Sequence, residues 1–133
     1  MAAYHYHLLL NGYANKPPTS VEETEAWVYQ LVDKIGMKVA IDPRAAYVEK
    51  EGNRGMTAVV GIETSHIAMH VWDETDPSFV QFDLYTCSTL DIDVVIEELE
   101  KFLDLYEYQT WILDRSQGFK HIEAKETLGQ QNL

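Results

Sequence analysis

Short apolar segments alternate along the chain with clusters of glycine, proline, asparagine and aspartate, a pattern typical of a protein that mixes strands and helices. Runs of β-prone residues between such clusters predict strands. We predict strands over residues 4–10, 38–41 with 45–48 (one bent strand or a pair around Asp42-Pro43), 56–62, 66–72, 79–86 and 108–113. Asn11-Gly12 is expected to end the first strand, 51–54 to form a turn, and the polar tail from 124 onward to fray.

Two segments show the three- to four-residue spacing of amphipathic helices. Before the first, Ser20 and Glu23 form a capping box, and Gly36 is the predicted C-terminal stop. Asp91 is the predicted N-cap of the second. The apolar positions are Val28, Leu31, Val32 and Ile35 in the first helix, and Val95, Leu99, Phe102 and Tyr106 in the second.

This order of elements predicts a single α+β domain over residues 1–133, a two-layer α/β sandwich with a mostly antiparallel sheet and both helices on one face. No repeat or low-complexity linker divides the chain, and its length fits one domain. Apolar residues on both sides of the sheet would leave its second face exposed in a monomer. We therefore expect a homodimer in which the two sheets stack.

Charge and cysteine content narrow the possible partners. The chain has 22 acidic and 10 basic residues and a net charge of −12, which disfavours nucleic acid and anionic membranes and favours a small cationic ligand. A solvated acidic surface explains the excess equally well. No apolar run approaches the ~20 residues of a membrane span, so we expect a cytoplasmic protein. A single cysteine, Cys87, excludes an internal disulfide and paired-cysteine zinc sites.

The candidate chemistry lies in residues 63–74 and 82–87, which contain Ser65, His66, His70 and Cys87. These supply a hydroxyl nucleophile, bases that titrate near neutrality and a thiol acid. We predict no metal site, because His66 and His70 on one strand would lie about 13 Å apart. Ser65 and His70 differ by an odd number of residues and would face opposite sides of a regular strand, so a bend or bulge is expected between them.

Taken alone, each of these residues has an ordinary explanation. A serine in a strand is usually a surface residue, a single cysteine in an apolar strand is usually an inert core thiol, and a tryptophan such as Trp72 is usually packing. His5 and His7 lie on one face of a predicted strand and are interpreted as a satisfied pair without a catalytic role.

The sequence pattern around these residues favours a functional explanation over the ordinary one. Gly-Met-Thr-Ala-Val-Val at 55–60, Ser-His-Ile-Ala-Met-His-Val-Trp at 65–72 and Asp-Leu-Tyr-Thr-Cys at 83–87 resemble the prokaryotic S-adenosylmethionine decarboxylases, a family of self-processing, pyruvoyl-dependent enzymes. The chain departs from that family's pattern at several positions. Thr64 stands where the family has glutamate, Asp73 where it has proline and Ser88 where it has glycine, and residues 47–54 lack the family's usual Phe and Pro.

The resemblance implies that the chain is cleaved between Thr64 and Ser65 and that Ser65 becomes a pyruvoyl group, the enzyme's own cofactor. In the family's terms, His70 transfers the proton during elimination and Thr57 assists it, Cys87 donates a proton during turnover, and Trp72 stacks on the adenine of the substrate. The substrate amine would form a Schiff base with the pyruvoyl carbonyl, which accepts the electrons left by loss of CO2. The implied activity is decarboxylation of S-adenosylmethionine for spermidine synthesis.

Two alternatives stay open. The altered segment 47–54 allows the same chemistry on a smaller basic amino acid, ornithine or arginine. Thr64 before the serine allows a homologue that does not process itself and acts as a ligand-binding or partner subunit.

Overall fold

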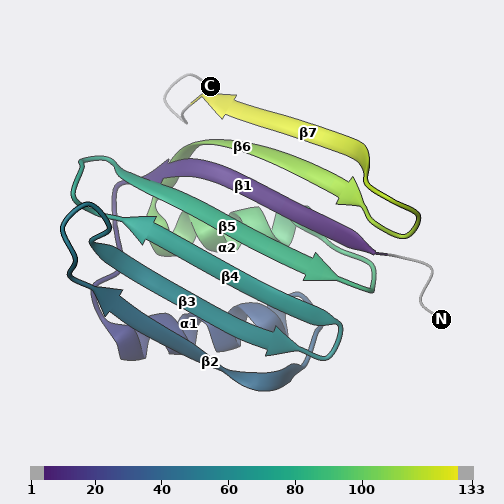
Figure 1. The fold of residues 1–133 in the computed structure, drawn as a ribbon, viewed down its shortest axis with the longest axis horizontal. Helices are drawn as coiled ribbons and strands as arrows, with labels where there is room; N and C mark the ends of the chain where they lie inside the picture. The colour runs from purple at the N-terminus through teal and green to yellow at the C-terminus, as the bar shows by residue number, and fades with distance from the viewer. Residues whose placement is uncertain (1–4, 129–133) are drawn as a thin grey trace.

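The structure, a computed structural model, describes residues 5–128 and forms an α+β fold (Figure 1). In these residues, seven strands make one sheet in the order β2-β3-β4-β5-β1-β6-β7, and every neighbouring pair is antiparallel. The prediction of a mostly antiparallel sheet is therefore confirmed. The elements are β1 (Tyr6–Ala14), α1 (Val21–Lys34), β2 (Val39–Val48), β3 (Gly55–Ile62), β4 (Ser65–Trp72), β5 (Ser78–Thr86), α2 (Ile92–Leu103), β6 (Leu105–Asp114) and β7 (Lys120–Leu128).

Both helices lie behind the sheet in the view of Figure 1, α1 against β2 and β3, and α2 against β6. Each begins at the predicted cap, because the Ser20 side chain accepts a hydrogen bond from the Glu23 N–H group and Asp91 accepts one from Val94. Alternate residues of the central strands fill the core between sheet and helices. Examples are Leu8, Leu10, Ile67, Met69, Val71, Val80, Phe82 and Leu84, all at most 2% exposed.

The first strand is longer than predicted, because Asn11-Gly12 continues it to Ala14 instead of ending it. Gly12 is needed for close approach to β6. A Cβ atom at this position would lie 2.8 Å from the Glu107 carbonyl oxygen and 2.9 Å from the Tyr108 Cβ. The glycine therefore serves strand packing here and does not form a turn.

The C-terminal part also differs from the prediction. Asp104 adopts a left-handed conformation, with φ of 51°, which ends α2 and places Tyr106 in β6 instead of the helix. Residues 120–128, part of which was predicted to fray, form β7 and pair with β6. The rest of that predicted tail, 129–133, lies outside the described residues. In β2 the two predicted pieces form one strand whose register with β3 shifts twice.

The face of the sheet opposite the helices, which we call the open face, carries side chains in rows that cross the strands. One row is Trp72, Phe79 and Tyr13; the next is Thr57, His70, Gln81, Asn11 and Gln109; the third is Val59, Ala68, Asp83, Leu9 and Trp111; the last is His66, Tyr85, His7 and Leu113. Tyr13, Val59 and Trp111 are 39%, 48% and 48% exposed. Neither helix in the described residues is long and apolar enough to cross a membrane.

Candidate active site

Ser65 is the first residue of β4 and follows directly on the turn at Glu63-Thr64. Its Oγ lies 3.5 Å from the Cys87 Sγ, which stands just beyond the end of β5. The Cys87 N–H group donates a hydrogen bond of 2.8 Å to the Thr64 carbonyl oxygen. The structure therefore brings together the predicted nucleophile, the predicted thiol and the carbonyl that the nucleophile would attack.

The backbone at Ser65 is strained. Its φ is +148°, in a region that residues with a side chain rarely adopt and that costs on the order of 1–3 kcal/mol. The pairing of β4 with β3 and β5 runs without a shift from Ser65 to Trp72, so the bulge expected between Ser65 and His70 is not present. The irregularity lies at Ser65 itself. Breaking the Thr64–Ser65 peptide would release this strain, while the Cys87 N–H would stabilise negative charge on the carbonyl oxygen during attack.

The second pair of predicted residues lies farther along β4. The Thr57 Oγ1 and the His70 Nδ1 are 3.1 Å apart, on neighbouring strands of the open face. His70 is five residues from Ser65, which is about 16 Å along a strand. Within one chain, the structure therefore joins Ser65 with Cys87 and Thr57 with His70, but keeps the two pairs apart.

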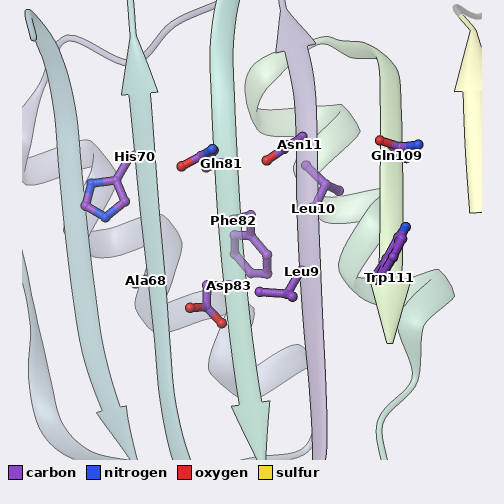
Figure 2. A pocket seen from close by; sticks show the side chains of 10 residues that line it. All are labelled: Leu9, Leu10, Asn11, Ala68, His70, Gln81, Phe82, Asp83, Gln109 and Trp111. Atoms are coloured by element: carbon purple, nitrogen blue, oxygen red, sulfur yellow. The ribbon is translucent and has the colours of Figure 1, made fainter. Parts of the chain in front are cut away.

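His70 lines a hollow of about 570 Å³ on the open face, a volume typical of small-molecule sites (Figure 2). Three amide side chains, Gln81, Asn11 and Gln109, continue the row that begins at Thr57 and His70. Local sequence patterns did not reveal this row, because it depends on the pairing of β1 with β5 and β6. The hollow is lined by Leu9, Leu10, Asn11, Ala68, His70, Gln81, Phe82, Asp83, Gln109 and Trp111, so Ser65 does not border it.

Trp72 is the last residue of β4, two residues beyond His70. Its ring stacks on Phe79 with centroids 5.4 Å apart and lies 5.9 Å from the His70 ring. Its Nε1 donates a hydrogen bond of 3.4 Å to the Asn53 side chain. Trp72 is not among the side chains that line the hollow.

The buried Asp73 carboxylate, whose contacts the sequence did not predict, holds the segment next to Trp72 in place. Asp73 accepts hydrogen bonds from the Tyr47 hydroxyl at 2.6 Å and the Arg54 Nε at 2.8 Å, and its side chain is 8% exposed. Burial alone would raise the pKa of Asp73, but the bonds from Tyr47 and Arg54 outweigh it and hold that pKa below its usual value. Two of the positions where the chain departs from the family's pattern, Asp73 and the 47–54 segment, therefore contact each other.

The remaining histidines near Ser65 are occupied by structural contacts. His7 Nε2 bonds to Asp83, and the Arg115 guanidinium lies 3.0 Å from His7 Nδ1. His5 Nδ1 lies 3.2 Å from the Tyr85 hydroxyl. These contacts agree with the interpretation of His5 and His7 as satisfied side chains.

Across the part of the chain that the structure describes, no three His, Cys, Asp or Glu side chains gather as a metal ion would require. His66 contacts the rings of His7 and Tyr85, whereas His70 lies beside Thr57 and Trp72.

In the described residues, a seven-stranded antiparallel sheet lies over two helices, and a strained serine stands beside a free thiol where β4 begins and β5 ends. The sequence model of the family described as S-adenosylmethionine decarboxylase matches residues 6–116. The chain therefore belongs to the S-adenosylmethionine decarboxylase family.

Three similar proteins bear names of the same kind. An S-adenosylmethionine decarboxylase proenzyme of Archaeoglobus fulgidus is 25% identical over 112 residues, which cover 82% of this chain and 95% of that protein. One of the same name from Thermococcus kodakarensis is 27% identical over 88 residues, 62% of this chain and 60% of that protein. An arginine decarboxylase proenzyme of Aeropyrum pernix is 29% identical over 123 residues, 91% of this chain and 89% of that protein.

We predict that Asp73→Asn lowers the free energy of unfolding by about 1 kcal/mol at pH 7, an estimate kept small because Arg54 is half-exposed. The pKa of Asp73 is lower in the folded state, so its contribution is complete above about pH 4 and is lost as pH falls through that folded pKa. Urea unfolding at several pH values should show the difference from the parent protein shrinking below pH 4. Glu97→Gln, which breaks an exposed ion pair with Lys101, is the control and should change stability little at either pH.

Proposed function

We propose that the protein is a self-processing, pyruvoyl-dependent decarboxylase that acts on S-adenosylmethionine and supplies polyamine synthesis in the cytoplasm. The observation that carries this proposal is the Thr64–Ser65 link. It combines a strained serine backbone, a carbonyl oxygen that already accepts the Cys87 N–H, and a hydroxyl 3.5 Å from a thiol. Membership of the family and the word proenzyme in the names of its relatives support the same conclusion.

The processing step uses only atoms of the chain. The Ser65 Oγ attacks the Thr64 carbonyl carbon, the C–N bond breaks, and an ester replaces the amide. Removal of the Ser65 α-proton then expels the Thr64 carboxylate and leaves a dehydroalanine. Water replaces its nitrogen, ammonia departs, and the second chain begins with a pyruvoyl group. The Cys87 N–H stabilises the oxygen that becomes negative in the first step.

The residues around Ser65 suit the group that would form there. A pyruvoyl group supplies a carbonyl that can accept an amine and withdraw electrons when CO2 leaves. The Cys87 thiol, at the side of Ser65, is placed to return a proton to the reacting carbon. Trp72 lies at the other end of β4 from Ser65, so its ring would meet a cationic sulfonium or an adenine at this site only from a second copy of the chain. The net charge of −12 favours a cationic substrate.

A homodimer would unite the two separated pairs. We propose that a second copy stacks on the open face about a two-fold axis perpendicular to the strands, so that the Thr57–His70 pair of one copy lies over the Ser65–Cys87 pair of the other. Exposed apolar side chains on this face, Tyr13, Val59 and Trp111, support such a contact. Each site would then take its nucleophile and thiol from one chain and its base from the other.

Arginine is the alternative substrate, favoured by two observations. One relative is named an arginine decarboxylase proenzyme, and the chain carries the polar Tyr47–Asp73–Arg54 network next to Trp72, at positions where it departs from the family's pattern. We rank S-adenosylmethionine first because a tryptophan ring suits stacking on an adenine, which arginine lacks.

Freshly purified protein should consist of two fragments that meet between Thr64 and Ser65, with the C-terminal fragment showing the mass of a pyruvoyl terminus. Intact-mass measurement checks this. Ser65→Ala should remain a single chain, because it removes the attacking hydroxyl. One uncleaved mass for the parent protein, even after prolonged incubation, would contradict the enzyme proposal and favour a binding or partner subunit.

His70→Ala alone should slow cleavage about 100-fold or more, as expected for loss of a general acid or base. Co-expression with Ser65→Ala tests the dimer, because the second variant cannot be cleaved itself but retains His70. Cleavage of the tagged His70→Ala chain should then recover. If the His70→Ala chain is cleaved equally slowly with and without its partner, the histidine acts within its own chain or not at all.

Processed enzyme should release CO2 from S-adenosylmethionine with a kcat/KM at least about 100-fold above that for arginine or ornithine, the kind of discrimination that one pocket can supply. Trp72→Ala should raise the KM for S-adenosylmethionine by roughly 10-fold or more, since stacking on a base contributes about 1–3 kcal/mol. The same variant should leave the extent of cleavage unchanged. Faster turnover of arginine would reassign the substrate without changing the chemistry.

A further inference from the structure

Two positions at which the chain departs from its family, Thr64 and Ser88, are linked through one buried side chain. Thr86, the last residue of β5, is fully buried. Its Oγ1 lies 3.0 Å from the Thr64 Oγ1 and 3.1 Å from the Ser88 Oγ. We call Thr64, Thr86 and Ser88 the hydroxyl chain.

The donors and acceptors of the hydroxyl chain can be assigned in one direction. The Ser88 N–H donates to the Thr86 Oγ1 at 3.2 Å, the Thr86 O–H donates to Thr64, and the Thr64 O–H points at the Met37 sulfur at 3.7 Å. Because the Thr86 proton goes to Thr64, the Ser88 hydroxyl is the donor in its 3.1 Å contact with the Thr86 Oγ1, in preference to the Thr89 carbonyl oxygen at 3.3 Å. Each hydroxyl proton is used once, so the chain is satisfied and fixes the rotamers of its members.

The end of β5 and the residue that follows it therefore contact Thr64 at two points. Thr86 bonds to its side chain, and the next residue, Cys87, donates its N–H to the carbonyl. One contact alone would allow the Thr64 peptide to rotate about the other. Together they fix the direction in which the carbonyl carbon faces Ser65.

We propose that the hydroxyl chain positions the Thr64 carbonyl for attack by Ser65, so that Thr64, Thr86 and Ser88 are positioning residues for self-processing. This inference rests on the proposed function. Thr64 and Ser88, two residues at which the chain departs from the family's pattern, then act together through one hydrogen-bonded chain. Orientation of reacting atoms is a large part of the rate of intramolecular reactions, so loss of the chain should slow cleavage.

The test follows cleavage of protein made by pulse-labelled cell-free synthesis, so that the uncleaved chain is observed from the start. Thr86→Val keeps the shape of the side chain but removes the central hydroxyl, and should slow cleavage about tenfold, the effect of losing one well-placed hydrogen bond. Thr86→Ser restores the hydroxyl and should return the rate to within about threefold of the parent protein.

Thr24→Val is the matched control. Thr24 is also fully buried and donates one hydrogen bond of 2.8 Å, to the Ser20 carbonyl oxygen at the start of α1. In a Ser65→Ala background, which keeps the chain intact, both valine variants should lower the melting temperature to a similar extent. Only Thr86→Val should slow cleavage in the Ser65 protein.

A double variant tests whether the members act as one chain. Thr64→Val and Thr86→Val remove the two ends of the same bond, so the double variant should be about as slow as the slower single variant. Multiplied effects would show that the residues act independently and would overturn the proposal, as would parental cleavage by Thr86→Val. A parent protein that is never cleaved at Ser65 would overturn both this inference and the proposed function, whereas normal cleavage in all variants would overturn this inference alone.

Discussion

The hydrogen bond from the Cys87 N–H to the Thr64 carbonyl oxygen ties the turn before β4 to the end of β5. It acts on the last peptide before the sheet resumes, where Ser65 has a φ of +148°. A tight turn could relieve such a backbone by rotating the preceding peptide. Here the rotation would break the bond to Cys87, so the strain is retained where the serine hydroxyl, the thiol and the carbonyl meet.

The regular pairing of β4 beyond Ser65 fixes where the other residues of the site lie. Successive residues of β4 alternate between the helix-covered face and the open face, and Ile67, Met69 and Val71 are buried. His70 must therefore stand on the open face beside Thr57, far along the strand from Ser65. Rigidity that keeps the strained end in place also prevents the histidine from reaching it, and this is the physical reason to look for a second chain.

The sequence allowed much of this to be predicted where the signal is local. The capping residues Ser20 and Asp91 marked both helix starts. The bulge was predicted wrongly, because the strain falls on one φ angle at Ser65 and leaves the register intact. Contacts that depend on long-range pairing were missed. Thr86 became visible as the partner of Thr64 only when β4 and β5 were aligned.

The place of β1 between β5 and β6 gives a cut at residue 64 an unusual outcome. The first fragment would keep β1, β2 and β3, and the second would keep β4, β5, β6 and β7. Since β3 borders β4 while β1 is enclosed on both sides by strands of the other fragment, the two pieces would share three strand interfaces. Strands of the two fragments would alternate across the sheet. Separation would require most of the sheet to unfold, so the nicked protein can lose its covalent continuity and keep its architecture.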